Sequence, residues 1–138
     1  MLPQKARYAL RAMLRLARED KPLPIRSIAE DEHIPRKFLE LILLELKSHG
    51  LVLSHRGKTG GYELAKPADA ISFADVMRVV DGPLALAPCA SRTAYRRCKD
   101  CPDPEECEIR ATLLEVRDAS AAILEACTLA SAISGLNP

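Results

Sequence analysis

The chain has 138 residues, of which 48% are hydrophobic, and this length and composition fit one folded domain with an appended element. No apolar run is long enough for a membrane span, and the charged N-terminus does not fit a signal peptide, so we expect a cytoplasmic protein with no membrane partner. No Ser-His-Asp set or phosphate-binding loop is apparent, so we expect no enzyme.

The formal charge of +1 conceals an uneven distribution along the chain. Residues 1–67 carry 13 Lys and Arg against 8 Asp and Glu, a net charge of +5. Residues 68–138 carry 7 against 11, a net charge of −4. The basic half suits a domain that faces phosphates, joined to a segment with another role.

Three helices are predicted in the basic half. Apolar residues recur at helical spacing over 4–18, and prolines at 22 and 24 separate this helix from a short second one. A third helix over 35–48 begins at Pro35 and stops before Gly50. Its apolar stripe consists of Phe38, Leu39, Ile42, Leu43 and Leu46.

After Gly50 the pattern changes from helical to extended. LVLSHR and YEL read as two strands joined by the glycine-rich turn GKTGG, which predicts a β-hairpin wing. Ser72 and Asp75 resemble a capping box at the start of a fourth helix, which Gly82 and Pro83 end.

Three helices followed by a two-stranded wing, with a basic bias, predict a winged helix-turn-helix that binds double-stranded DNA. Arg36, Lys37 and Glu40 lie at the exposed start of the third helix, where side chains reach phosphates or base edges. Arg56 and Lys58 flank a glycine in the wing and are the candidate contacts there.

The acidic half contains a loop over 83–104 that holds four prolines and three cysteines and cannot bury much apolar area unaided, so something must order it. A long helix from Glu105 to about Ala132 follows. Its apolar residues repeat about every 3.5 positions, which is typical of packing against a second copy of the chain. They are Ile109, Leu113, Val116, Ile123 and Cys127.

Four cysteines, Cys89, Cys98, Cys101 and Cys107, fall within nineteen residues and form a candidate metal site. Four thiolates suit a 2Fe-2S or 4Fe-4S cluster, and they suit zinc equally well. A thiol-disulfide switch at the Cys98–Cys101 pair is a further possibility. Cys127 lies apart and is expected to be an inert core residue.

The segments KARYALRAMLRLA, IRSIAEDEHIPRKFLELILLELKSHGLV and SHRGKTGGYELAKPADAISFADVMRVVDGP resemble the iron-sulfur cluster regulator (IscR) and nitric-oxide-sensitive repressor (NsrR) group of winged-helix transcription regulators. The resemblance implies a homodimer, joined through the long helix, that binds imperfect palindromes in promoters. Matching positions for DNA contacts are Lys37, Phe38, Glu40 and Arg56.

The same resemblance favours an iron-sulfur cluster on Cys89, Cys101 and Cys107. The family's fourth ligand is a histidine or an aspartate, but Arg110 and Arg7 occupy those two positions here. We therefore hypothesise that Cys98 completes the site, with an oxygen ligand as the alternative.

The predicted fold is mostly α-helical with a small β-hairpin wing, a winged helix-turn-helix followed by a long C-terminal dimerisation helix. The predicted divisions are the DNA-binding domain at 1–67, a connecting helix at 68–84, the cysteine-rich cluster loop at 85–107 and the dimerisation helix at 105–132. The predicted function is a homodimeric transcription regulator that senses redox state, iron or nitric oxide through its cluster. The alternative is a winged-helix repressor stabilised by zinc or switched by a disulfide.

Overall fold

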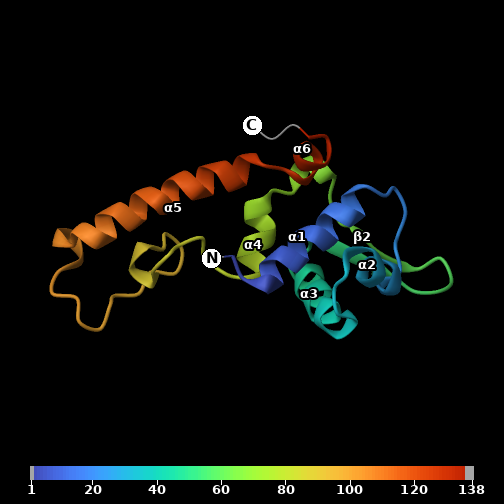
Figure 1. Cartoon of the computed structure of the whole chain (residues 1–138), viewed down its shortest axis with the longest axis horizontal. Helices are drawn as coiled ribbons and strands as arrows, with labels where there is room; N and C mark the ends of the chain where they lie inside the picture. Colours follow the sequence, from blue (N-terminus) through green and yellow to red (C-terminus); the bar gives the residue numbers. More distant parts are fainter. Residues whose placement is uncertain (1, 136–138) are drawn as a thin grey trace.

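The computed structural model describes residues 2–135 and has a rounded body from which one long helix projects (Figure 1). The body holds α1 (Gln4–Ala17), α2 (Ile25–Glu32), α3 (Arg36–Ser48) and α4 (Phe73–Val80). The hairpin of β1 (Val52–His55) and β2 (Gly61–Leu64) lies at the edge of the body. The projecting helix is α5 (Glu108–Ala126), and α6 (Leu129–Ile133) returns to the body. The described residues contain no helix both long and apolar enough to span a bilayer.

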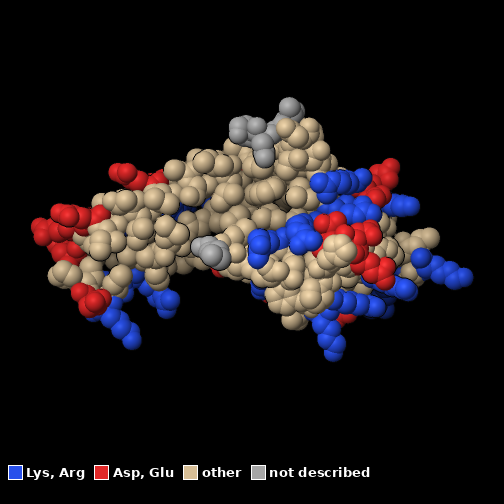
Figure 2. Space-filling model, in the orientation of Figure 1, with Lys and Arg blue, Asp and Glu red and all other residues tan. Residues whose placement is uncertain are grey.

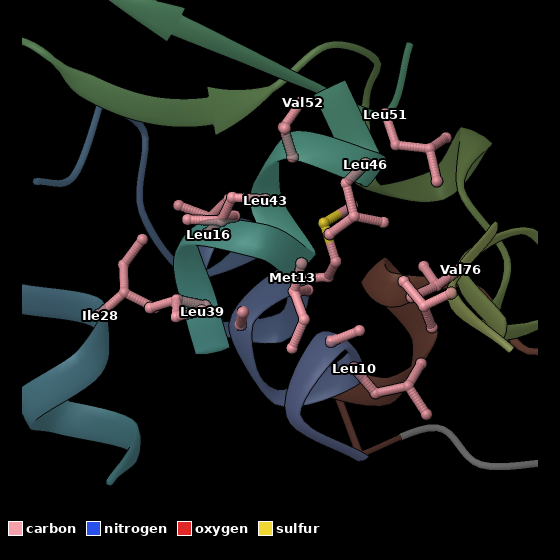
Figure 3. Packing of buried hydrophobic residues seen from close by; sticks show 14 of the residues in the cluster. Leu10, Met13, Leu16, Ile28, Leu39, Leu43, Leu46, Leu51, Val52 and Val76 are labelled. Carbon is pink, nitrogen blue, oxygen red and sulfur yellow. The ribbon is translucent and has the colours of Figure 1, made fainter. Parts of the chain in front are cut away.

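The core lies where α1, α3 and α4 meet (Figure 3). Met13 of α1, Leu43 of α3 and Val76 of α4 are each fully buried there. Each of the three belongs to a set of apolar residues that recur three or four positions apart in its own helix, and the helix brings such a set onto one face. The three-helix arrangement predicted from apolar spacing is confirmed, with α3 beginning one residue after Pro35.

The wing and the fourth helix form as predicted. Strand β1 pairs antiparallel with β2, with Val52 opposite Leu64 and His55 opposite Gly61. At the start of α4, Ser72 Oγ accepts from the Asp75 backbone N–H and Asp75 Oδ2 accepts from the Ser72 backbone N–H, both at 3.0 Å. This reciprocal pair satisfies two backbone donors at the helix end. The mostly helical winged fold is confirmed.

The prediction of one helix from Glu105 to Ala132 is wrong at both ends. Residues Pro104–Glu106 form a separate 3-10 turn, and Cys107 caps α5. At the other end, Cys127 adopts an extended conformation, and Thr128 starts α6 with a second capping box that it shares with Ser131. The apolar and alanine-rich composition continues across this break, so periodicity did not reveal it.

The break lets the C-terminal segment join the core of the body. The Phe73 N–H donates to the Cys127 carbonyl at 2.9 Å, and the Leu129 N–H donates to the Ile71 carbonyl at 2.9 Å. Leu129 is fully buried in the same cluster as α1 and α3. Cys127 is buried as predicted, but it lies in the link between two helices and not on a helical stripe.

Candidate nucleic-acid interface and cysteine loop

The N-terminal turns of α3 present charged side chains to solvent. Arg36, Lys37 and Glu40 are all exposed, because Leu39 and the other core residues of α3 occupy the opposite face. Arg36 Nε lies 3.6 Å from Glu40 Oε1, an exposed pair one helical turn apart. Such a pair is worth a few tenths of a kcal/mol at most, so DNA phosphates can compete for Arg36 at little cost.

Phe38 does not belong to the buried stripe to which its spacing assigned it. Its side chain is 36% exposed, and its ring meets the edge of Tyr8 at a centroid distance of 5.6 Å. This contact holds the ring beside the outward face of α3. The position agrees with the DNA contact that the family resemblance implies for Phe38, which stays a prediction.

The wing presents Arg56 and Lys58 in the exposed turn between β1 and β2. Gly57 between them has φ +99°, a positive value that glycine adopts readily and other residues disfavour. Gly61 serves a different purpose, because a Cβ there would collide with the Leu23 carbonyl. Leu23 and Tyr62 exchange backbone hydrogen bonds of 2.9 and 2.8 Å, which attach the base of the wing to the segment before α2.

The basic surface is smaller than the charge count implies. Blue and red side chains intermingle over the body in Figure 2. Lys5 pairs with Glu45 at 2.6 Å, and Arg15 pairs with Glu19 at 2.6 Å and Asp31 at 3.0 Å. Hydrogen bonds to Glu19 and then Asp31 raise the pKa of Arg15 above its usual value.

Three of the four cations at the predicted contact positions differ from these paired ones, the exception being Arg36. Within residues 2–135, Lys37, Arg56 and Lys58 have no carboxylate at salt-bridge distance. Their charge is therefore available to an anionic partner. Unpaired positive charge is therefore present at the start of α3 and in the turn of the wing.

The cysteine loop places its four sulfurs in different surroundings. Cys89 is buried, Cys98 is exposed, and Cys101 and Cys107 are half-buried. A side-chain hydrogen bond to Cys89, followed by charge repulsion from the same group, raises the pKa of the Cys98 thiol. Cys107 caps α5, where its Sγ accepts the Arg110 backbone N–H at 3.4 Å.

Arg110 ties together the two ends of this loop. Its Nε donates to the Cys89 carbonyl at 2.9 Å and its Nη1 to the Pro104 carbonyl at 3.5 Å. The guanidinium also lies 5.6 Å from the centre of the Tyr95 ring. The sequence identified Arg110 only as a residue that cannot be a metal ligand. No local pattern predicts its hydrogen bond to Cys89, which lies 21 residues earlier in the chain.

A second arginine fastens the middle of the loop to α5. Arg92 donates from Nη2 to Asp118 Oδ2 at 2.7 Å and from Nε to Asp118 Oδ1 at 3.2 Å. This hydrogen bond to Arg92 is the largest cause of the lowered pKa of Asp118. The two arginines hold the loop along α5.

The donor set has the right chemistry for a metal centre, since thiolates bind both iron-sulfur clusters and zinc. In the described part of the chain, no three His, Cys, Asp or Glu side chains converge closely enough to hold a metal ion. Cys89 is the largest cause of the raised pKa of Cys98, which indicates that these two thiols are neighbours, whereas the Cys107 sulfur caps the start of α5. Loading of all four thiols therefore requires the loop to rearrange, and the four-cysteine site stays a prediction.

Helix α5 exposes an apolar face along its length. Ile109 is 73% exposed, Val116 40% and Ile123 68%, at intervals of seven residues. This spacing returns to the same side of a helix after two turns. In Figure 1 most of α5 projects away from the body, so a single chain does not cover this face.

Comparison with known proteins agrees with this architecture. The model of the Rrf2 family, described as iron-dependent transcriptional regulators, matches residues 2–135. The chain is 42% identical to an rrf2-like HTH-type transcriptional regulator of Rhodobacter capsulatus, over 100% of this chain and 95% of that protein.

Two solved structures extend the likeness to the fold. CymR, the global cysteine regulator of B. subtilis, superposes with a TM-score of 0.78 and 31% identity, over 97% of this chain and 96% of its own. IscR of T. potens superposes with a TM-score of 0.78 and 26% identity, over 98% and 87%. The resemblance stated from the motifs is confirmed, and the relatives are named as regulators, as expected for a protein that is not an enzyme.

Proposed function

Because this chain belongs to the Rrf2 family of transcriptional regulators, we propose that it binds double-stranded DNA with α3 in a major groove and the wing beside it. The observation that carries this proposal is the unpaired, exposed charge of Lys37, Arg56 and Lys58. Arg36, Phe38 and Glu40 complete the proposed contact set at the start of α3. Arginine and lysine contact phosphates or guanine edges, and a carboxylate accepts from cytosine.

The chain acts as a homodimer in this proposal, joined through the apolar face of α5. Two copies of this face cover Ile109, Val116 and Ile123, which a single chain leaves in water. A two-fold dimer presents two recognition helices, so the matching operator is an imperfect palindrome whose half-sites lie about 34 Å apart.

Salt dependence of binding tests the proposed interface. Lys37→Ala and Arg56→Ala are each expected to weaken binding to a promoter duplex and to reduce the slope of log K against log salt by about one, because each removes one phosphate contact. Arg26→Ala is the control, since Arg26 is an exposed cation of α2 that pairs with Glu30 at 3.0 Å. Equal salt slopes for all three variants and the wild type would show that α3 and the wing are not the DNA interface.

The signal is received at the cysteine loop in this proposal. In it, an iron-sulfur cluster of the 2Fe-2S or 4Fe-4S type is held by four thiolates, those of Cys89, Cys98, Cys101 and Cys107. Cys98 serves as the fourth ligand in place of the histidine or aspartate of the family. The family description as iron-dependent regulators and the IscR fold neighbour support this assignment. A bound cluster supplies iron–sulfur bonds that respond to iron supply, oxidants or nitric oxide.

The loop transmits the signal because its two ends belong to different structural units. Cys107 begins α5, the proposed dimer helix, and Cys89 follows the segment that leaves α4 and the body. A change in loop order alters the angle between α5 and the body, and hence the spacing of the two recognition helices. A change in affinity of about tenfold needs about 1.4 kcal/mol of coupling free energy.

Zinc binding or a disulfide switch is the second candidate for the same loop. The influence of Cys89 on the pKa of Cys98 favours it, and one solved fold neighbour is the oxidized form of CymR of Staphylococcus aureus. Zinc holds four thiolates without redox chemistry. An oxidant such as hydrogen peroxide would join the Cys89 and Cys98 thiols as a disulfide by taking two electrons and two protons from them.

Anaerobic purification followed by absorption spectroscopy and metal analysis separates these candidates. Visible absorption bands with bound iron and sulfide support the cluster. Colourless protein with one zinc, or without metal, supports the alternatives. Cys98→Ser is expected to change the spectrum while Cys127→Ser, the matched control, leaves it unchanged. An unchanged spectrum in Cys98→Ser contradicts all-cysteine ligation.

A further inference from the structure

The outward face of the proposed recognition helix is apolar at its centre. Leu41 is 59% exposed and Leu44 is 61% exposed, although both lie in a helix that buries four other apolar residues. They follow Lys37 by four and seven positions, so all three side chains lie along one side of α3. The run LELILLEL is apolar on both sides of the helix, which hid this second face from pattern analysis.

The core does not use these two leucines. The buried residues of α3 are Leu39, Ile42, Leu43 and Leu46, which face α1 and the rest of the body. A leucine left in water forgoes the favourable free energy of burying its apolar side chain. Two such side chains, side by side on a functional helix, indicate that a partner covers them.

The charge around the leucines identifies that partner as DNA. Lys37 lies on the same side of α3, and Arg36 and Lys47 are exposed on its flanks. These cations place positive charge on the same helix as the leucines, and Lys37 has no carboxylate at salt-bridge distance among residues 2–135. The major groove offers one apolar group to such a surface, the C5 methyl of thymine.

We propose that Leu41 and Leu44 determine operator specificity by contacting thymine methyl groups in the major groove. This inference rests on the proposed DNA binding and adds the base that the helix selects. The two residues lie about 4.5 Å apart along the helix axis, close to one base step of about 3.4 Å. The preferred half-site therefore carries adjacent thymines beneath the middle of α3.

Replacement of thymine by deoxyuridine tests the contact, since it removes the methyl group and keeps the base pairing. The wild-type protein first selects its preferred duplex from a random-sequence library, and each thymine is then replaced in turn. Loss of a methyl contact is expected to weaken wild-type binding about fourfold at the contacted positions, because each buried methyl group contributes about 0.8 kcal/mol.

The variants Leu41→Ala and Leu44→Ala make the assignment specific. Each is expected to weaken binding to the thymine duplex and to become insensitive to deoxyuridine at its own position, so that the two losses do not add. Leu86→Ala is the control, because Leu86 is a 67% exposed leucine outside the winged body. It is expected to retain the wild-type affinity and the full deoxyuridine effect.

Three results would overturn the inference while leaving DNA binding intact. One is a selected duplex in which no deoxyuridine weakens binding. Another is an equal deoxyuridine effect in the wild type and in both leucine variants. The third is a change in sedimentation mass of Leu41→Ala without a change in affinity, which would assign the leucines to a protein interface. Failure of the wild type to select any duplex refutes the proposed function itself, and this inference with it.

Discussion

Arg110 is predicted to hold the two ends of the cysteine loop together, and Arg110→Met removes this support while keeping much of the side-chain volume. The variant loses a charged hydrogen bond of 2.9 Å to the Cys89 carbonyl and the contact with the Tyr95 ring. A hydrogen bond to a charged group contributes about 1.5–3 kcal/mol, and a partly exposed cation–π contact about 0.5–1 kcal/mol.

Solvent competes for part of this energy, because 19% of the Arg110 side chain is exposed. We therefore expect a loss of about 2 kcal/mol in local stability, or about thirtyfold in the equilibrium for opening the loop. The global stability should change less, since the main hydrophobic cluster contains no residue between 81 and 128.

Hydrogen exchange of the metal-free protein, read by mass spectrometry, measures this opening. The probes are the Ala90 and Arg96 amides, which donate to the Ala87 and Pro88 carbonyls at 3.0 and 3.1 Å. Both amides are expected to exchange about thirtyfold faster in Arg110→Met, because local opening exposes them. Arg117→Met is the control, because Arg117 lies two turns further along α5 and is similarly buried, but it bonds to Asp118.

Unchanged protection of both amides in Arg110→Met would refute this account of the loop. Equal acceleration in Arg110→Met and Arg117→Met would also refute it, since it would show that the helix and not the cross-link sets loop order.

Three further predictions concern the scaffold. Gly61→Ala should lower the free energy of unfolding by about 1–3 kcal/mol in urea titrations, because its Cβ meets the Leu23 carbonyl. It should cost more than Gly57→Ala, which has a positive φ but open space around it; equal losses would contradict the role of close approach. Ser72→Ala should cost about 1 kcal/mol through the lost capping box, and an unchanged urea midpoint would argue against the cap. Ile123→Glu should convert a dimer to a monomer in light scattering, whereas Ala122→Glu, exposed on another side of α5, should not; a dimeric Ile123→Glu would move the interface elsewhere.

Short-range patterns in the sequence determined most of the scaffold. The spacing of apolar residues predicted α1 and α3, the glycine-rich turn predicted the hairpin, and Ser72 with Asp75 predicted the cap of α4. Each of these signals depends on residues within one or two turns of one another. Backbone propensity and capping act over that range, so sequence alone is sufficient to read them.

Sequence also identified the chemistry without its arrangement. Four thiols within nineteen residues predict a metal or redox site. The influence of Cys89 on the pKa of Cys98, and the capping role of Cys107, depend on how the loop folds back along α5. Loop conformation follows from contacts between distant residues, which spacing along the chain does not encode.

Only the tertiary structure decided the features that depend on partners far apart in sequence. The chain leaves the helical path at Cys127 because Thr128 caps a new helix and Leu129 finds a fully buried place among residues of α1, α3 and α4. Arg110 bonds to Cys89 across 21 positions, and Leu41 faces outward because Leu39 and Ile42 already fill the core. Helical periodicity shows that a helix has faces, but burial is assigned by whichever neighbours the fold brings against each face.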